Sequence, residues 1–158
     1  MDCEGVSINP AEPGDLGDIL TLLSAVELPH EGVAEHLGGF LVARDGEGRL
    51  AGMIGLERHG STGLLRSAAV APGLQRTGLG SCLTSALLRI AQGEGVEKVV
   101  LLTTTAREFF ARRFGFSETD RAEFDGQLSG SPEWRLPRCS SAVCMSLDLK
   151  GEGSWRNN

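Results

Sequence analysis

Residues 64–81 read LLRSAAVAPGLQRTGLGS, and this stretch decides the fold class of the chain. It begins with an apolar segment over 64–71 that is typical of a β-strand, and it breaks at Pro72. A helix is predicted over 81–92, because the apolar residues there recur at the spacing of one helical face. The segment between them is a loop with three glycines, so the order is strand, loop, helix.

The loop over 75–80, QRTGLG, has the composition of an anion-binding turn. Gly78 and Gly80 allow the backbone to turn tightly with its N–H groups pointing outward, and the following helix adds the positive end of its dipole. No Gly-Lys-Ser/Thr follows, which excludes a Walker A loop, and the glycine spacing excludes G-x-G-x-x-G. Two interpretations remain, a loop that holds the diphosphate of coenzyme A and an ordinary strand-to-helix turn.

The rest of the chain reads as alternating strands and helices around this motif. Turn residues over 45–48 and 59–63 separate three apolar strands, which predicts an antiparallel meander. The expected elements are strands over 6–9, 40–43, 50–57, 64–71, 99–102 and 142–149, helices from Leu16 to Leu23, over 81–92 and over 106–113, and an irregular loop over 121–138.

Length and composition set limits on the function. The 158 residues predict one domain over 1–149 and a polar tail over 150–158. The net charge of −6 argues against nucleic acid as a partner, and the absence of a leader or an apolar span predicts a cytoplasmic protein without membrane contact. Four scattered cysteines predict reduced thiols, and the spacing of His30 and His36 argues against a metal site.

Three segments in order carry a family resemblance: VAP at 70–72, QRTGLG at 75–80 and FFARRFGF at 109–116. Together they resemble the GNAT acetyltransferase superfamily, and the resemblance covers nearly the whole chain. It implies an α/β (α+β) fold, with a mixed, mostly antiparallel sheet of about six or seven strands and about four flanking helices. The sheet would be splayed at a cleft for acetyl-CoA, the co-substrate, and no metal would be needed. Many relatives are dimers, so the resemblance also allows a homodimer.

The resemblance also implies which residues bind the co-substrate. Backbone groups at 69–71 would hydrogen-bond the pantetheine arm, and the loop would hold the pyrophosphate. The residues implied are Ala69, Val70, Ala71, Gln75, Arg76, Thr77, Gly78, Leu79, Gly80, Ser81, Thr104, Phe109, Phe110 and Arg113.

Acetyl transfer needs a proton acceptor, because an amine attacks a thioester only when unprotonated. Glu57 is the expected base, since it ends a strand where many family members carry a glutamate, and His59 is the reserve. The backbone N–H of Val70 would stabilise the developing oxyanion. Phe110 stands where most members have the tyrosine that protonates the leaving thiolate, and the chain contains no tyrosine. The thiolate therefore leaves unprotonated, or a water or threonine supplies the proton.

Within the superfamily the chain is most similar to arsenic-resistance N-acetyltransferases and to the acetyltransferase domain of N-acetylglutamate synthase. The similarity lies in LLRS at 64–67, LLTTT at 101–105 and SSAVCM at 140–145. Those relatives acetylate glutamate or mimics such as phosphinothricin and arsinothricin, which implies a small amine carrying carboxylate-like charge. A guanidinium and hydroxyl groups would bind it. The candidates are Arg66, Thr103 and Ser141, with Arg44 and Arg121 weaker, while Cys139 and Cys144 are expected to be buried small residues.

Three functions stay open at this point. The first is a small-molecule N-acetyltransferase, and the second is a protein or peptide N-acetyltransferase with an open acceptor groove. The third is a non-catalytic acyl-CoA-binding module, which the missing tyrosine allows. The long loop over 121–138 favours the first if it closes the site.

Overall fold

The computed structural model describes residues 2–3, 5–136 and 142–150. The chain divides into two compact units, Met1–Leu56 with Ser67–Leu87, and Glu57–Arg66 with Leu88–Asn158. Two strands and one helix contribute residues to both units.

The first unit is built on antiparallel strands that follow one another along the sheet. The turn predicted over 45–48 is confirmed: Gly48 has a φ of 80°, and Asp45 Oδ1 accepts a hydrogen bond from the Arg49 N–H at 3.0 Å. Asp45 also accepts hydrogen bonds from the Glu47 N–H and from the Arg49 side chain. Hydrogen bonding lowers the pKa of the Asp45 carboxyl, and the bond from the Arg49 N–H is the largest cause. The strands are β1 (Asp2–Cys3), β2 (Val6–Pro10), β3 (Phe40–Asp45), the first part of β4 (Leu50–His59) and the last part of β5 (Thr62–Val70).

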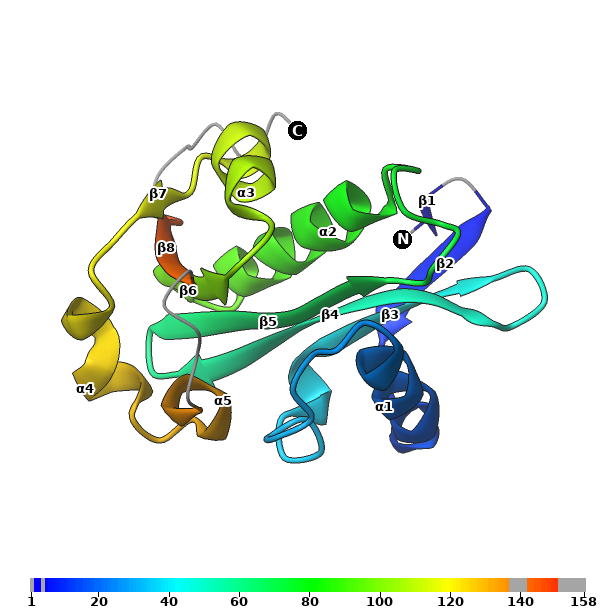
Figure 1. The fold of residues 1–158 in the computed structure, drawn as a ribbon, viewed down its shortest axis with the longest axis horizontal. Helices are drawn as coiled ribbons and strands as arrows, with labels where there is room; N and C mark the ends of the chain where they lie inside the picture. Colours follow the sequence, from blue (N-terminus) through cyan, green and yellow to red (C-terminus); the bar gives the residue numbers. More distant parts are fainter. Residues whose placement is uncertain (1, 4, 137–141, 151–158) are drawn as a thin grey trace. The chain divides into compact units, whose positions relative to one another are not determined.

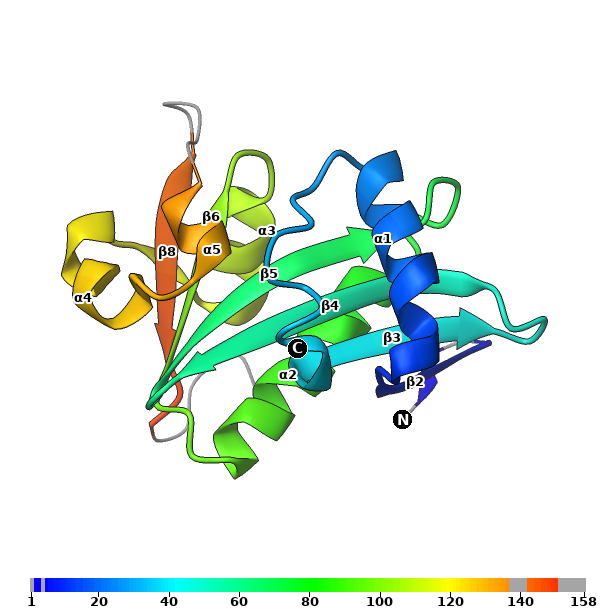
Figure 2. The same cartoon turned by 90° about the horizontal axis from the view of Figure 1, so that it is seen from below.

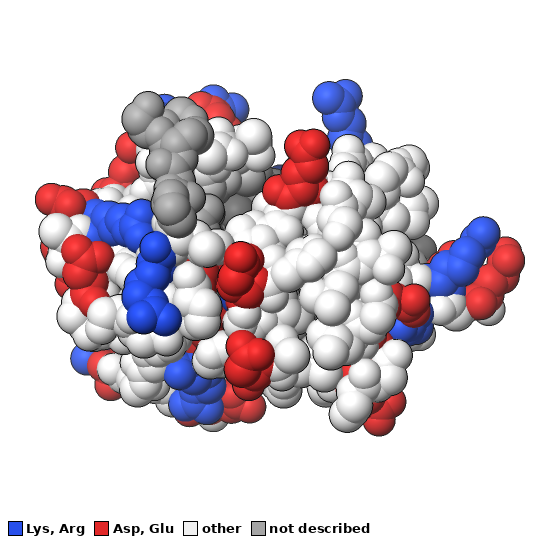
Figure 3. All heavy atoms as spheres, turned by 60° about the horizontal axis from the view of Figure 1, so that its bottom comes forward, with Lys and Arg blue, Asp and Glu red and all other residues white. Residues whose placement is uncertain are grey.

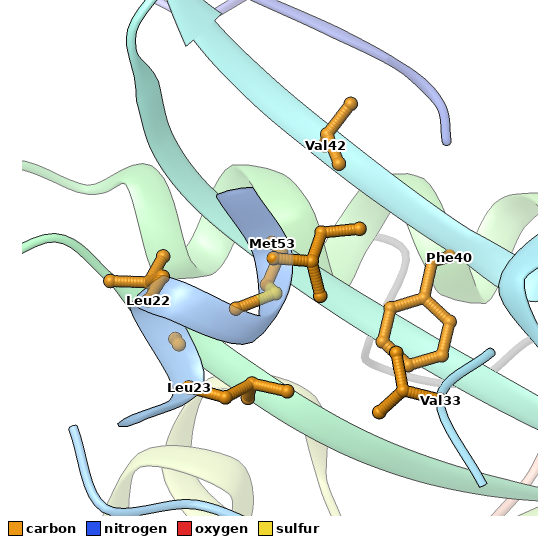
Figure 4. Packing of buried hydrophobic residues seen from close by; sticks show 8 residues of the cluster. Leu22, Leu23, Val33, Phe40, Val42 and Met53 are labelled. Atoms are coloured by element: carbon orange, nitrogen blue, oxygen red, sulfur yellow. The ribbon is translucent and has the colours of Figure 1, made fainter. Parts of the chain in front are cut away.

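Helix α1 (Leu16–Ala25) forms because its apolar residues recur at helical spacing, as predicted, and it buries Ile19, Leu22 and Leu23. Figure 4 shows Met53 of β4 between the two leucines of α1 and the ring of Phe40. Each of these fully buried side chains contributes about 1.5–3 kcal/mol through removal from water. This cluster fixes the register of β3 on β4 in the first unit.

Helix α2 (Leu79–Gly93) begins in the first unit, directly after the glycine-bearing loop. Leu79 and Leu83 lie against Gly52 of β4, where an added Cβ would stand 3.1–3.2 Å from their methyl groups. Figures 1 and 2 show α1 and the start of α2 on opposite faces of β3 and β4. The first unit is thus a sheet covered on both sides.

The second unit holds the remaining strands and three helices. The end of β4 and the start of β5 form a hairpin in this unit, and β5 pairs in parallel with β6. Helix α3 ends at Gly115 in the left-handed region, with a φ of 80°. The new elements are β6 (Lys98–Thr103), α3 (Arg107–Phe114), β7 (Ser117–Glu118), α4 (Asp125–Leu128), α5 (Pro132–Arg135) and β8 (Val143–Asp148). Figures 1 and 2 show α3 on one face of β6 and β8, and α4 and α5 on the other.

Hydrogen bonding orders the strands as β1-β2-β3-β4-β5-β6-β8-β7. The β5–β6 pair is parallel, and the β1–β2, β2–β3, β3–β4, β6–β8 and β7–β8 pairs are antiparallel. The predicted fold class, a mixed sheet with flanking helices, is confirmed. The two-residue strands β1 and β7 were not predicted, because so short a strand leaves no periodic pattern.

The expectation of an irregular loop over 121–138 is wrong for its described part. Residues Arg121–Phe124 form a 3-10 helix, and α4 and α5 follow. Phe124, Leu128 and Trp134 are buried in one cluster with residues of β5 and β6. The apolar side chains of this segment therefore fold it onto the sheet as helical turns.

The expectation of reduced thiols is wrong for two of the four cysteines. Cys3 of β1 and Cys82 in the first turn of α2 form a disulfide, with Cα atoms 6.3 Å apart. They are separated by 79 residues, so only the folded first unit brings them together. Cys144 is free and buried, as expected, and Cys139 lies outside the described residues.

No helix in the described part of the chain is long and apolar enough to span a bilayer.

On the face drawn in Figure 3, acidic and basic side chains are interspersed.

Candidate functional site

The second unit contains a buried ion pair between neighbouring strands. Glu57 of β4 and Arg66 of β5 have no exposed side-chain surface, and Arg66 Nη1 donates to Glu57 Oε2 at 2.7 Å. The turn between the two strands, with Gly60 at a φ of 69°, places them across the hairpin. The strand-end carboxylate predicted from sequence is therefore an internal group rather than a solvated one.

His59 shares the side of β4 on which Glu57 lies, because β4 continues to His59 and side chains two apart point the same way. Its Nε2 lies 3.0 Å from Glu57 Oε1, and 15% of its side chain is exposed. The two oxygens of Glu57 thus face different partners, an arginine and a histidine. The structure brings together three of the predicted side chains: Glu57, His59 and Arg66.

Glu133 was missed in the sequence and lies at the same cluster. Its Oε2 is 3.8 Å from Nε of Arg66, and only 9% of its side chain is exposed. It stands in α5, whose N-cap Ser131 accepts the N–H of Trp134 at 3.2 Å. Ser131 followed by Pro132 is a helix-start signal, so the turn was predictable, although its contact with Arg66 was not.

The first unit contains the predicted anion-binding loop; Gly80, which was expected to shape its turn, lies inside α2 instead. Gly78 has a φ of 89°, Arg76 has a φ of 68°, and both are exposed. Thr77 Oγ1 donates to the Leu74 carbonyl at 2.7 Å, which closes the turn before α2 begins at Leu79. Two left-handed residues followed by the start of a 15-residue helix are features that anion-binding turns share.

The end of β5 presents alternating backbone groups. The N–H of Ala71 donates to the Ala51 carbonyl at 2.8 Å, toward β4. Because successive residues of a strand point their N–H groups to opposite sides, the N–H of Val70 faces away from β4. Ser67 has a φ of 58° inside β5, an uncommon conformation for a residue with a side chain and one that costs about 1–3 kcal/mol. Such strain is concentrated at functional sites.

Strands β5 and β6 pair over three residues only. The register covers Thr62, Gly63 and Leu64 of β5, whereas β5 runs to Val70 and β6 runs to Thr103. The backbone groups beyond that register are not paired between these two strands.

The site residues predicted at the end of β6 and in α3 contact other parts of the fold or are exposed. Thr103 Oγ1 accepts the N–H of Ala106 at 2.9 Å, which starts α3. Phe110 is 4% exposed and packs edge-on against Phe109 and Phe116, with centroids 5.0 and 5.4 Å apart. Phe110 is therefore a core residue of an aromatic cluster. Thr104 and Arg113 are exposed.

Two other predicted arginines are already engaged. Arg44 pairs with Asp15 at 2.6 Å and with Asp18 at 3.0 Å. The hydrogen bond to Asp15 is the main cause of a raised pKa of Arg44. The pKa of Asp15 is lowered, most strongly by the hydrogen bond from the Glu12 N–H and next by the one from Arg44. Arg121 donates to the Trp134 carbonyl and stacks over its ring, 4.7 Å from the centroid. Ser141 lies outside the described residues.

Comparison with known proteins gives a family match and one curated relative. Residues 16–116, more than half of the chain, match the acetyltransferase (GNAT) family. The mycothiol acetyltransferase of Pseudarthrobacter chlorophenolicus is 31% identical over 142 residues, which cover 74% of this chain and 44% of that protein.

Solved structures share the fold. N-acetylglutamate synthase from Neisseria gonorrhoeae, complexed with coenzyme A and N-acetyl-glutamate, has a TM-score of 0.74 at 24% identity, covering 92% of this chain and 35% of that one. A GNAT acetyltransferase from Staphylococcus aureus has a TM-score of 0.75 at 15% identity, covering 92% and 99%. A Mycobacterium tuberculosis protein in complex with CoA has a TM-score of 0.72 at 24% identity, covering 90% and 98%.

The chain spans less than half of the curated relative and about a third of the synthase. The identities to solved structures support the fold alone. The family match extends from α1 through the glycine-bearing loop to Phe116, and so includes Glu57 and every residue predicted to bind the co-substrate, but not Ser141. On that match, the chain belongs to the acetyltransferase (GNAT) family.

Proposed function

We propose that this protein transfers an acetyl group from acetyl-CoA to the amine of a small amino-acid-like molecule, with Glu57 as general base. The observation that carries the proposal is the buried Glu57, held at 2.7 Å by Arg66 on the neighbouring strand. An internal carboxylate with a fixed orientation suits proton abstraction better than a solvated one. We also propose that residues 1–149 act as one domain, because β4, β5 and α2 contribute to both units.

The co-substrate acetyl-CoA supplies the thioester. In the proposal, the backbone N–H groups of residues 75–81 and the start of α2 bind its diphosphate, and Arg76 adds a screened charge. Residues 69–71 hydrogen-bond the pantetheine arm at the end of β5. The N–H of Val70, which faces away from β4, donates to the oxygen on which negative charge develops.

The reaction forms the N–C bond of the amide and breaks the C–S bond of the thioester. The amine proton passes to Glu57, directly or through a water, and His59 is the reserve acceptor at 3.0 Å from Glu57 Oε1. Phe110, buried among aromatic rings, offers no proton. The thiolate therefore leaves as such or takes a proton from water or a threonine, which a free-thiol pKa of about 8.5 allows.

For the acceptor we propose glutamate or a glutamate-mimicking antibiotic of the phosphinothricin or arsinothricin type. The N-acetyl-glutamate bound by the similar synthase supports this class. Arg66, Thr103, Ser141 and Arg44 are the proposed acceptor-binding residues. Arg66 already holds Glu57, so a substrate carboxylate would share its guanidinium, and neutral and cationic amines therefore belong in the test.

The test is a free-thiol release assay with acetyl-CoA and a panel of glutamate, phosphinothricin, polyamines and peptides, alongside calorimetry of acetyl-CoA binding. Turnover with an amino-acid-like amine supports the proposal. Turnover with peptides alone would indicate a peptide N-acetyltransferase. Binding of acetyl-CoA without turnover on any acceptor would indicate a binding module, and no binding to folded protein would exclude all three.

A further inference from the structure

A disulfide ties the start of α2 to the edge of the sheet in the first unit. Cys3 lies on β1, which pairs with β2 over two residues, and Cys82 lies in the first turn of α2. Figure 1 shows β1 beside the turn that leads into α2. Both cysteines are partly exposed, and a partly exposed disulfide is open to attack by thiols from solution.

Cys82 is joined directly to the predicted anion-binding loop. Its N–H donates to the Gly78 carbonyl at 3.1 Å, and Gly78 is one of the residues proposed to hold the diphosphate. Residues 72–78 are exposed. Because an exposed segment opens locally at low free-energy cost, its conformation depends on how its ends are held. The disulfide therefore restrains the end of the loop at which the helix begins.

We propose that the Cys3–Cys82 pair is a reversible thiol–disulfide modification site that controls the binding of acetyl-CoA. With the bond formed, the start of α2 is held and the N–H groups of the loop are preorganised for the diphosphate. With the bond reduced, the same groups sample more conformations, and binding costs the additional free energy of ordering them. The reduced form therefore binds acetyl-CoA more weakly. The inference rests on the proposed role of this loop.

The modifying reagent is a dithiol reductant. One thiolate of the dithiol attacks Sγ of Cys3, forms a mixed disulfide and expels Cys82 as a thiolate, whose negative charge the positive end of the α2 dipole stabilises. The second thiol of the reductant attacks the mixed disulfide, releases Cys3 and leaves the reductant as a disulfide. Two electrons and two protons pass from the dithiol to the cysteine pair, and a small oxidised disulfide reverses the exchange.

Control of this kind requires a reduced form that stays folded. The apolar cluster around Phe40 and Met53 is built from side chains of α1, β3 and β4, so the pairing of these strands does not depend on the disulfide. Binding and redox state are then linked: if the oxidised form binds acetyl-CoA more tightly by some factor, the ligand shifts the thiol–disulfide equilibrium toward the bond by the same factor. A disulfide that only stabilised the fold would show no such dependence on the ligand.

The first test is calorimetry with acetyl-CoA on four samples: oxidised wild type, wild type reduced with a phosphine that is then removed without oxygen, Cys3→Ser, and Cys144→Ala. Cys144→Ala is the matched control, since it removes a free thiol and keeps the disulfide. Cys3→Ser breaks the bond and leaves every residue of the loop unchanged. We expect reduced wild type and Cys3→Ser to bind about tenfold more weakly than oxidised wild type, a usual size for coupling between sites.

Reversibility and linkage separate control from a purely structural role. Oxidised glutathione should restore the affinity of the reduced wild type, the phosphine should not alter Cys3→Ser, and Cys144→Ala should respond as the wild type does. The second test places the wild type in a buffer of reduced and oxidised dithiothreitol with desulfo-coenzyme A, which carries the diphosphate and no thiol. This ligand should raise the equilibrium constant for forming the Cys3–Cys82 bond by the factor by which oxidation tightens its own binding.

Equal affinities of folded oxidised and folded reduced wild type would overturn the inference and leave the acetyltransferase proposal standing. Loss of folding on reduction, seen by circular dichroism, would also overturn it, because the bond would then be a structural cross-link. If Cys3→Ser alone does not fold, the reduced wild type decides. No binding of acetyl-CoA to either folded form would instead overturn the proposed function and this inference with it.

Discussion

Arg66 Nη1 lies 2.7 Å from Glu57 Oε2, and neither side chain has exposed surface. The pair joins two strands of one hairpin, so its geometry is set by the turn between them. Its burial means that a change to either residue removes a charged partner of the other in the protein interior.

Glu57→Gln removes the proposed base and keeps the volume of the side chain. We expect kcat to fall by about 10²-fold or more, the usual contribution of a general base. Calorimetry should show an unchanged affinity for acetyl-CoA. The companion variant His59→Gln should lose less than Glu57→Gln, and equal turnover of Glu57→Gln and wild type would rule Glu57 out.

Arg66→Ala should destabilise the protein by about 3–5 kcal/mol, because it removes the guanidinium that faces two buried carboxylates. Urea unfolding measures this change. The control is Arg58→Ala, whose pair with Glu94 at 3.3 Å is about half exposed and should contribute less than about 1 kcal/mol. Where Arg66→Ala remains folded, the KM for the acceptor should rise, and an unaltered value would contradict its acceptor-binding role.

Reduction of the Cys3–Cys82 disulfide should lower the free energy of unfolding by about 2–5 kcal/mol, since it releases a loop of 79 residues in the unfolded chain. Thermal unfolding of the wild type with and without dithiothreitol measures this effect. The Cys3→Ser variant should unfold near the temperature of the reduced wild type. Sensitivity of Cys3→Ser itself to dithiothreitol would show that another bond is responsible.

Burial raises the pKa of the Cys144 thiol to about 11, the largest cause being desolvation. At pH 8 only about one thiol in a thousand is then ionised, and the thiolate is the reactive form. We expect iodoacetamide to leave Cys144 unmodified in native protein and to modify it in guanidinium chloride, as read by peptide mass spectrometry. Rapid native alkylation would show that the thiol is accessible.

Gly39→Ala and Gly38→Ala form a matched pair in the first unit. A Cβ on Gly39 would stand 2.1 Å from the Leu56 carbonyl oxygen, a backbone atom that cannot move aside, whereas Gly38 has open space. Gly39→Ala should therefore cost more than 1 kcal/mol and Gly38→Ala much less, by about the amounts seen for overpacked and surface sites. Equal midpoints of urea unfolding would contradict the close approach of Gly39 to β4.

Segments with regularly spaced apolar residues, and segments bounded by turn residues, were predictable from the sequence. The helix from Leu16, the hairpin turn at 45–48 and the helix end at Gly115 each depend on residues close in sequence. Glu57 and His59 were also predicted on one side of a strand, because side chains alternate along it. Local rules therefore located the longer helices and strands and the place of Glu57 and His59 on β4.

Contacts between distant residues were not predictable. Nothing near Arg66 in the sequence indicates that its guanidinium meets Glu133, 67 positions later, because the docking of α5 depends on the burial of Trp134. The partner of Cys3 could not be read from cysteine spacing either. Such pairs follow from packing of the whole unit rather than from local pattern.

Trp134 gives the second unit an intrinsic optical reporter. The chain has two tryptophans, and only Trp134 lies among the described residues, where it is wedged in an apolar cluster beside the turn that carries Glu133. A Trp155→Phe variant would make the emission of one indole a label-free signal of whether that turn is seated. Ligand titrations and stopped-flow mixing could then follow the position of α5 beside Arg66 in real time.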